Sequence, residues 1–374
     1  MNSLPTKPFL KPNSKVSRER GVALVVILLV VAIISVLATE MVGRLQLNIA
    51  RTVNIKDNNQ AYWYAIGAEQ FAQKSLGELK TLSPDNMNLS QPWAQVFEYP
   101  IDGGGIQAEL IDLQACFNLN TLGPLVTQNQ NPSNNGSSGS SGTAPLANQT
   151  AAQPNNGQNQ NPNGAAQTPA QAFYNLLIKS NDNIDSYTAE TLRDSLTDWL
   201  DADGNITGLG AEDADYESLT IPYVAANALM TNKSELRLIK GIEPSILRNI
   251  LPFVCVIPDQ AFNSLQLNIN TITEENAAIL AAMLNLDVED ASRIIASRPE
   301  EGFENTNDFF TEPEIVALNL TPQQKEWFTI KTNYFMLRIK TRYNEASFKM
   351  TSIFKLDDGD SGVSVISREF GGVN

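Results

Sequence analysis

An apolar run from Val22 to Ala38 is the first strong feature of the hydrophobic pattern. A helix of this length spans about 25 Å, near the lower limit for crossing the hydrocarbon core of a bilayer. From Glu40 to about Lys80 the chain has no proline, and its apolar residues recur at a spacing typical of an amphipathic helix. The pattern predicts one long helix that begins in a membrane and continues out of it.

Alternating apolar and polar positions predict strands in two places. Trp93–Phe97 and Ile106–Ile111 flank three glycines, which is typical of a hairpin. Near the end of the chain, Asn344-Glu345 and an Asp-rich turn separate three further runs, which indicates an antiparallel meander. These runs cover residues 332–343, 346–355 and 362–370.

A segment without charged residues and a helical region separate the two groups of strands. Residues 127–169 consist mostly of Asn, Gln, Ser, Gly, Pro, Ala and Thr, which predicts a disordered insertion. Residues 170–330 then show helical periodicity with short turns, which indicates a compact all-α domain inserted between strands. The predicted helices are Ala170–Lys179, Thr188–Leu200, Ile221–Met230, Pro244–Leu251, Glu274–Asn285 and Val288–Ser297.

The residues around the apolar run indicate how the chain is anchored. Five positive charges against one negative precede the run, which predicts a cytoplasmic N-terminus and a single pass with the bulk of the chain outside. A cleaved secretory signal, with its site after Val36-Leu37-Ala38, and an uncleaved anchor are two alternatives. In the third, the charged leader ends in Arg20-Gly21, and Val22 begins the apolar run. This pattern resembles type IV pilins and type II secretion pseudopilins, and implies a prepilin peptidase cut between Gly21 and Val22.

One departure from the pilin pattern narrows the resemblance. Most members carry a glutamate fifth after the cut, whereas this chain has Val26. Together with a large domain beyond the membrane and the segment Asp112–Leu122, this resembles the protein K family of minor pseudopilins. The resemblance implies an α+β pilin-like fold, with a long transmembrane helix packed on an antiparallel sheet and a large inserted all-α domain. It divides the chain into a leader (1–21), helix and first strands (22–126), disordered insertion (127–169), α-domain (170–330) and last strands (331–374).

The same resemblance implies a location and partners. Members are subunits in the bacterial inner membrane with most of their chain in the periplasm. The implied partners are the minor pseudopilins I and J, the prepilin peptidase, the inner-membrane secretion platform, and secreted cargo or the outer-membrane secretin.

Composition argues against most other functions. The chain has 26 Lys and Arg against 41 Asp and Glu, a formal charge of −15, and no histidine. The negative charge disfavours nucleic acid as a partner. Without histidine, the Ser-His and Cys-His pairs and the commonest zinc ligand are absent. The sequence therefore predicts a protein that is not an enzyme.

An acidic segment from Asp198 to Glu217 is the main candidate site. It holds seven carboxylates and no Lys or Arg, so the charges repel one another unless a cation neutralises them. Oxygen ligands without His or Cys select a hard ion, and a large, flexible set favours Ca²⁺. Four of the residues fit EF-hand positions, but Ile206 occupies the glycine position. The segment also resembles the calcium-binding loop of protein K, and a solvated acidic loop is the alternative. The predicted ligands of one or two ions are Asp201, Asp203, Asn205, Glu212, Asp213 and Asp215.

Two further patterns bear on function. Leu267–Thr271, the turn Leu284–Asp287 and Arg298–Phe303 resemble the helix-hairpin-helix of DNA-uptake proteins, but the seven acids and two arginines from Glu274 to Glu301 would repel phosphate. Beyond the inner membrane the environment is oxidising, which favours a Cys116–Cys255 bridge over two buried free thiols.

We therefore expect a minor pseudopilin at the tip of the type II secretion pseudopilus. A subunit at the tip of a type IV pilus and a periplasmic DNA-uptake protein are the alternatives.

Overall fold

The structure, a computed structural model, describes residues 20–123, 167–181, 184–262, 264–357 and 362–371. Residues 1–19 of the predicted leader (1–21) and residues 127–166 of the predicted disordered insertion lie outside these ranges. The last residues of that insertion begin a helix, because Thr168 accepts a hydrogen bond from the backbone N–H of Gln171 at 3.2 Å and Pro169 is the first helical residue.

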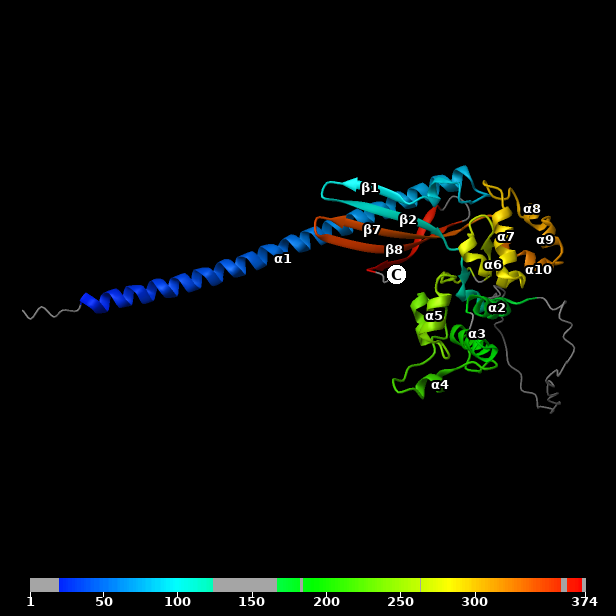
Figure 1. Cartoon of the computed structure of the whole chain (residues 1–374), viewed down its shortest axis with the longest axis horizontal. Helices are drawn as coiled ribbons and strands as arrows, with labels where there is room; N and C mark the ends of the chain where they lie inside the picture. Colours follow the sequence, from blue (N-terminus) through cyan, green and yellow to red (C-terminus); the bar gives the residue numbers. More distant parts are fainter. Residues whose placement is uncertain (1–19, 124–166, 182–183, 263, 358–361, 372–374) are drawn as a thin grey trace, which may run out of the picture.

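The long helix predicted from the sequence is confirmed. Helix α1 (Arg20–Leu82) runs without interruption for 63 residues, and Figure 1 shows its first half projecting alone from the rest of the molecule. An 18-residue window in this helix has a mean hydropathy of 3.2 and no buried residue, which fits a membrane span. The second half buries one face on a sheet. Its buried apolar residues are Ala61, Ala65, Ala68, Ala72 and Leu76.

The sheet is antiparallel throughout, in the order β1-β2-β7-β8-β9. β2 pairs along its whole length with β7, so that Gly104 lies opposite Tyr343 and Asp112 opposite Phe335. Everything between β2 and β7 is therefore an insertion into one sheet, and the three predicted C-terminal strands are confirmed. The strands are β1 (Phe97–Ile101), β2 (Gly104–Asp112), β7 (Tyr334–Tyr343), β8 (Ala346–Leu356) and β9 (Val363–Phe370).

The predicted first strand of the hairpin is displaced. Pro92–Ala94 forms the 3₁₀ helix η1, and β1 begins only at Phe97. The indole N–H of Trp93 donates to Oε1 of Gln91 at 2.8 Å, and its ring lies 5.0 Å from that of Phe335. Trp93 thus packs on the core of the sheet from a short helix, since Pro92 fixes φ there and has no N–H for a ladder.

The inserted domain is mainly helical, with two short parallel strand pairs that join distant segments. Its core includes Phe117, Leu176, Leu196 and Leu280, all almost fully buried. The helices are α2 (Pro169–Ser180), α3 (Ser186–Leu200), α4 (Asp213–Glu217), α5 (Pro244–Ile250), α6 (Ala277–Leu284), α7 (Val288–Ser297), α8 (Thr306–Phe310), α9 (Pro313–Val316) and α10 (Pro322–Lys325), with 3₁₀ helices η2 (Leu119–Leu122), η3 (Lys233–Leu238) and η4 (Glu274–Asn276). The strand pairs are β3 (Phe117–Asn118) with β4 (Val254–Cys255), and β5 (Leu267–Asn268) with β6 (Phe328–Thr329).

One predicted helix is wrong. Residues 221–230 contain no helix, because Pro222 supplies no N–H and Asn227 adopts a left-handed φ of 46°. Short helices that the sequence analysis did not predict, such as α8 and α10, begin instead at the capping residues Asn305 and Thr321. The α+β class is as predicted, but the insertion predicted to be all-α is mainly helical and also contains the two short strand pairs. Figure 1 shows the insertion at the end of the molecule opposite the free part of α1.

Candidate metal centre and domain junction

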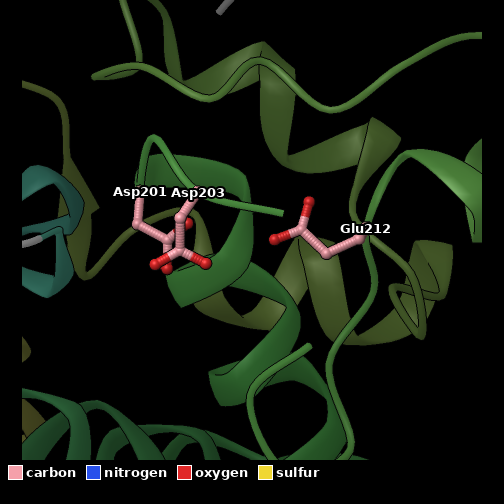
Figure 2. A group of neighbouring side chains, drawn as sticks. All are labelled: Asp201, Asp203 and Glu212. Atoms are coloured by element: carbon pink, nitrogen blue, oxygen red, sulfur yellow. The ribbon is translucent and has the colours of Figure 1, made fainter. Parts of the chain in front are cut away.

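Three of the predicted ligands meet in the acidic loop. Asp201 follows α3 directly, Asp203 lies two residues on, and Glu212 approaches from the far side of the turn (Figure 2). One carboxylate oxygen of each lies within 4.8 Å of the other two. This spacing suits a single cation bound among three carboxylates.

Burial sets Glu212 apart from an ordinary surface acid. Its side chain is 4% exposed, and neither carboxylate oxygen has a hydrogen-bond partner. Burial raises the pKa of Glu212, and the negative charges of Asp198 and Asp201 raise it further. Burial likewise raises the pKa of Asp201, with Asp203 adding to it, and Oδ1 of Asp201 is also buried without a partner. Buried carboxylate oxygens without donors are costly, and a bound cation would remove that cost.

The other predicted ligands have different contacts. The side-chain amide of Asn205 donates to Oδ1 of Asp203 at 2.7 Å, so Asn205 lies beside the cluster. Oδ1 of Asp213 accepts the backbone N–H of Ala225 at 2.9 Å. Oδ1 of Asp215 pairs with Nζ of Lys240 at 3.0 Å. Asp213 and Asp215 therefore hold the chain around the loop rather than join the three clustered acids.

Two aspartates one turn apart on α3 shape the loop. Asp198 is fully buried and accepts the backbone N–H of Thr207, while Asp194 accepts that of Leu209 at 2.9 Å. Burial raises the pKa of Asp198, and its hydrogen bonds with Thr207 act in the opposite direction. A Cβ on Gly210 would lie 2.0 Å from Oδ2 of Asp198, so only glycine fits there.

Sequence analysis missed two members of this region. The acidic segment contains no cation, but Lys240 reaches it from 25 residues away and also donates to the carbonyl of Gly210 at 3.1 Å. No local pattern indicates such a distant partner. Asp194 could have been found, because its spacing of four from Asp198 places both on one helix face.

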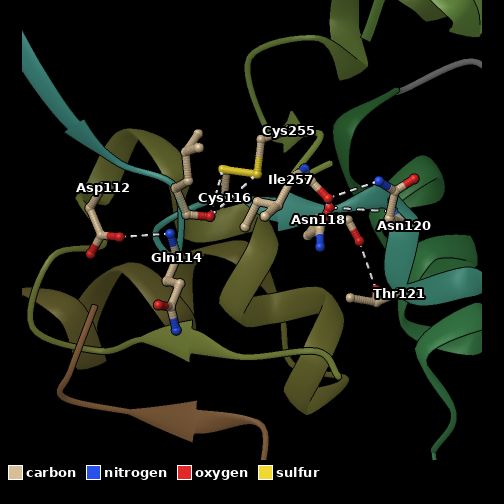
Figure 3. Close-up of a disulfide and its surroundings, with 9 residues drawn as sticks. Asp112, Gln114, Cys116, Asn118, Asn120, Thr121, Cys255 and Ile257 are labelled. Atoms are coloured by element: carbon tan, nitrogen blue, oxygen red, sulfur yellow. Dashed lines mark hydrogen bonds between the residues drawn. A yellow bond between two sulfur atoms is a disulfide. The ribbon is translucent and has the colours of Figure 1, made fainter. Parts of the chain in front are cut away.

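The two cysteines lie where the sheet meets the inserted domain. Figure 3 shows the disulfide between Cys116 and Cys255, with an S–S distance of 2.06 Å. Nearby, Oδ1 of Asn118 accepts the backbone N–H of Ile257 at 3.1 Å, and the amide of Asn120 donates to the carbonyl of Ile257 at 2.9 Å. The segment after β2 is thus tied covalently and by hydrogen bonds to the strand β4.

A buried carboxylate lies at the same junction. Asp112, the last residue of β2, accepts hydrogen bonds from the backbone N–H of Gln114 at 2.6 Å and from the hydroxyl of Thr332 at 2.6 Å. Asn268 and Thr271 of the inserted domain also donate to it. Burial raises the pKa of Asp112 to about 6, although these hydrogen bonds act in the opposite direction. Asp112 therefore joins the sheet to the inserted domain without a cation.

A long helix packed on an antiparallel sheet, with a mainly helical domain inserted between two of its strands, defines a pilin-like subunit. Family profiles described as type II secretion system protein K match residues 115–259 and 267–331. Type II secretion system protein K of Aeromonas hydrophila is 33% identical over 90% of this chain and 93% of its own length. That of Dickeya chrysanthemi is 32% identical over 95% of this chain and 98% of its own. The chain belongs to the protein K family of the type II secretion system.

A solved structure agrees with this assignment. The crystal structure of the GspK-GspI-GspJ complex from enterotoxigenic Escherichia coli contains a chain that is 27% identical, with a TM-score of 0.66. The match covers 86% of this chain and 100% of that one. The pilin-like fold predicted from the sequence is confirmed, and the family is one of structural pseudopilins.

Proposed function

We propose that this chain is a minor pseudopilin at the tip of the type II secretion pseudopilus, where it helps to initiate assembly and to export exoproteins across the outer membrane. The observation that carries the proposal is the position of the inserted domain. It lies beyond the end of α1 that is farthest from the apolar run (Figure 1). A domain of this size in that position would block the next subunit above it but leave the sides of α1 free.

The membrane segment supports the same position. In α1 the apolar run contains no carboxylate, and Val26 stands where most pilins carry a glutamate. A carboxylate in a bilayer requires a partner, so a subunit with no neighbour above has no need of it. In this proposal the chain crosses the inner membrane once, with its N-terminus in the cytoplasm and its folded part in the periplasm. A prepilin peptidase removes the leader after Gly21.

The proposed partners are the pseudopilins I and J. The similar solved chain is named as part of a GspK-GspI-GspJ complex, which supports this choice. The inner-membrane platform, secreted cargo and the secretin are the further partners that a subunit in this position would meet.

We also propose that the acidic loop binds Ca²⁺ through Asp201, Asp203 and Glu212, with Asn205 at the edge of the site. The buried, unpartnered oxygens of Glu212 support an ion rather than a solvated loop. A bound ion would fix the turn to the end of α3 and so order this side of the inserted domain.

The remaining alternatives have weaker support. A type IV pilus tip would share the leader and the long helix, but the family match favours secretion. The helix-hairpin-helix resemblance has a structural counterpart in α6 and α7, joined through Asn285 at a left-handed φ of 55°. Its surface nevertheless carries Glu274, Glu275 and Glu289, which argue against bound DNA.

Co-purification tests the proposed function. The full-length chain, expressed with full-length pseudopilins I and J and extracted in detergent, should elute with both in one complex. A major pseudopilin tagged in the same way is the matched control. N-terminal sequencing of the purified chain should begin at Val22, whereas a start at Thr39 would indicate a secretory signal. Tagged chain found at regular intervals along assembled filaments would refute the tip position.

A further inference from the structure

The face of the sheet turned away from α1 changes character along its length. Near the inserted domain, Met336, Ile353 and Ile366 pack against a cluster that contains Cys255 and Tyr334. Farther along the same face the side chains are exposed and basic. We call these residues the cationic face: Arg338, Lys340, Arg342 and Lys349.

The strand register places like charges together on this face. Lys340 of β7 lies directly opposite Lys349 of β8. Two like charges in directly opposed positions destabilise a sheet. None of the ion pairs among the described residues involves a member of the cationic face. The sheet thus holds Lys340 and Lys349 side by side, and the one acid in register with the cationic face on β2 is Glu109, opposite Arg338.

A fifth cation adds to the local positive charge. Lys233 of η3 belongs to the inserted domain, and its neighbour Asn232 donates a hydrogen bond to Glu369 of β9. Burial lowers the pKa of Lys233 and the positive charge of Arg338 lowers it further, while the negative charge of Glu369 acts in the opposite direction. The acids of the region, Glu109 on β2 and Glu369 on β9, lie on the strands beside the central pair. Positive charge is therefore concentrated on β7 and β8, in a chain whose formal charge is −15.

A groove runs over the cationic face. It has a volume of about 300 Å³ and exposes both polar and apolar surface. The outward-facing residues that line it are Gln107, Glu109, Arg338, Lys340, Lys349 and Thr351.

Distance from the membrane argues against lipid headgroups as the ligand. The hydroxyl of Thr341, between Lys340 and Arg342 in sequence, donates to the carbonyl of Ala61 on α1 at 2.8 Å. Ala61 lies 23 residues beyond Ala38, the end of the apolar run, so the face stands about 35 Å along the helix from that end at 1.5 Å per residue. Nucleic acid is disfavoured by the overall negative charge. An acidic protein segment is the anion that fits this position.

We propose that the cationic face binds an acidic segment of a neighbouring protein subunit. In the bound state this segment lies across β7 and β8. Carboxylates of that segment neutralise the opposed Lys340 and Lys349. The inference goes beyond the proposed function, because it assigns a surface that neither the membrane helix nor the inserted domain provides.

The test uses the full-length chain in detergent and a fluorescent hexaglutamate peptide, measured by fluorescence anisotropy at low salt. Saturable binding is expected, and it should weaken as salt rises. The double variant K340E/K349E should raise Kd at least tenfold. The matched control R237E/R248E makes the same charge change at exposed residues of the inserted domain and should leave Kd within a factor of two.

A second measurement separates lost binding from lost folding. The single variant K349E places opposite charges in register, so its Tm should equal or exceed that of the wild type while its peptide binding falls. No saturable binding, equal losses in the two double variants, or preference for phosphatidylglycerol vesicles over the peptide would overturn the proposal. If the chain still co-purifies with pseudopilins I and J in those cases, the proposed function stands and only the cationic face fails.

Discussion

Buried carboxylates have opposite surroundings in two regions of the molecule. One region is the contact between α1 and its sheet, and the other is the acidic loop of the inserted domain. Glu69 of α1 is 2% exposed, and it accepts hydrogen bonds from the guanidinium of Arg368 at 2.6 and 2.8 Å. Burial opposes its ionisation, but the hydrogen bonds from Arg368 and Ser352 outweigh burial and hold the pKa of Glu69 below its usual range. Glu212 is buried to a similar degree without any donor, and its pKa is raised.

The contact between α1 and the sheet is therefore complete within one chain, because the chain supplies donors to Glu69. The acidic loop is incomplete in this sense, because the described part of the chain supplies no donor to the carboxylate of Glu212. Where α1 packs on the sheet, the chain supplies the partner of its own buried carboxylate, Arg368 for Glu69, and buries a continuous apolar layer. The acidic loop gathers negative charge and leaves both carboxylate oxygens of Glu212 without a hydrogen-bond donor.

The largest effect is expected from breaking the covalent tie between the regions. Cys116 and Cys255 are separated by 139 residues in sequence. Closing a loop of that length is worth roughly 4–5 kcal/mol in the chain-entropy model. The variant C116A/C255A should lose about that much stability in denaturant unfolding, with the sheet and the inserted domain then unfolding in separate steps. Equal midpoints for the variant and the wild type, both measured without reductant, would contradict this.

The variant Glu69→Ala tests the contact between α1 and the sheet. It removes the partner of Arg368 and leaves the hydroxyl of Ser352 without its acceptor. Breaking a buried pair on one side typically costs 3–5 kcal/mol, and the partial exposure of Arg368 places this case near the lower end, at about 3 kcal/mol. Denaturant unfolding measures the loss in the free energy of unfolding.

The control variant is Lys331→Ala. It breaks a pair with Asp85 in which both side chains are more than half exposed, and it should cost under about 1 kcal/mol.

How much of this was predictable differs between the two regions. The long helix and the C-terminal strands follow from period and alternation, because each buries one face on the other. The grouping of Asp201, Asp203 and Glu212 was partly predictable from acid density, but the different roles of Asp213 and Asp215 were not. Those roles depend on Lys240 and Ala225, which the fold brings from distant sequence positions. Glu69 and Arg368 were missed for the same reason, since one lies on α1 and the other on the last strand.

Asp112, at the junction, gives an intermediate case that pH can test. Its four donors are neutral, and burial raises its pKa from 3.8 to about 6. Between pH 4 and 6 the folded state therefore binds more protons at this site than the unfolded state, so its contribution to stability falls as pH rises through that window. The difference in unfolding free energy between wild type and D112N should change by about 2–3 kcal/mol from pH 4 to pH 7, since each pKa unit is worth about 1.4 kcal/mol. A constant difference across this range would show that Asp112 does not titrate there.

Calcium addition tests the incomplete region, with the smallest expected effect. If Asp201, Asp203 and Glu212 bind one ion, a free calcium concentration ten times Kd should stabilise the full-length chain by about 1.4 kcal/mol, from RT ln(1 + [L]/Kd). The stabilisation should shrink as pH falls through the raised pKa values of Glu212 and Asp201, because protonated carboxylates bind the ion weakly. Thermal melts in EDTA and in millimolar calcium measure the effect, and calorimetry measures the heat of binding.

The variant E212Q should abolish both the stabilisation by calcium and the heat of binding. In EDTA it should be at least as stable as the wild type, because it removes a buried charge that has no partner. E217Q removes a charge from the same acidic segment, at the end of α4 and outside the three clustered acids, so it should keep the response to calcium. Equal responses of E212Q and E217Q would show that Glu212 does not bind the ion and that the loop acts only as a diffuse negative surface.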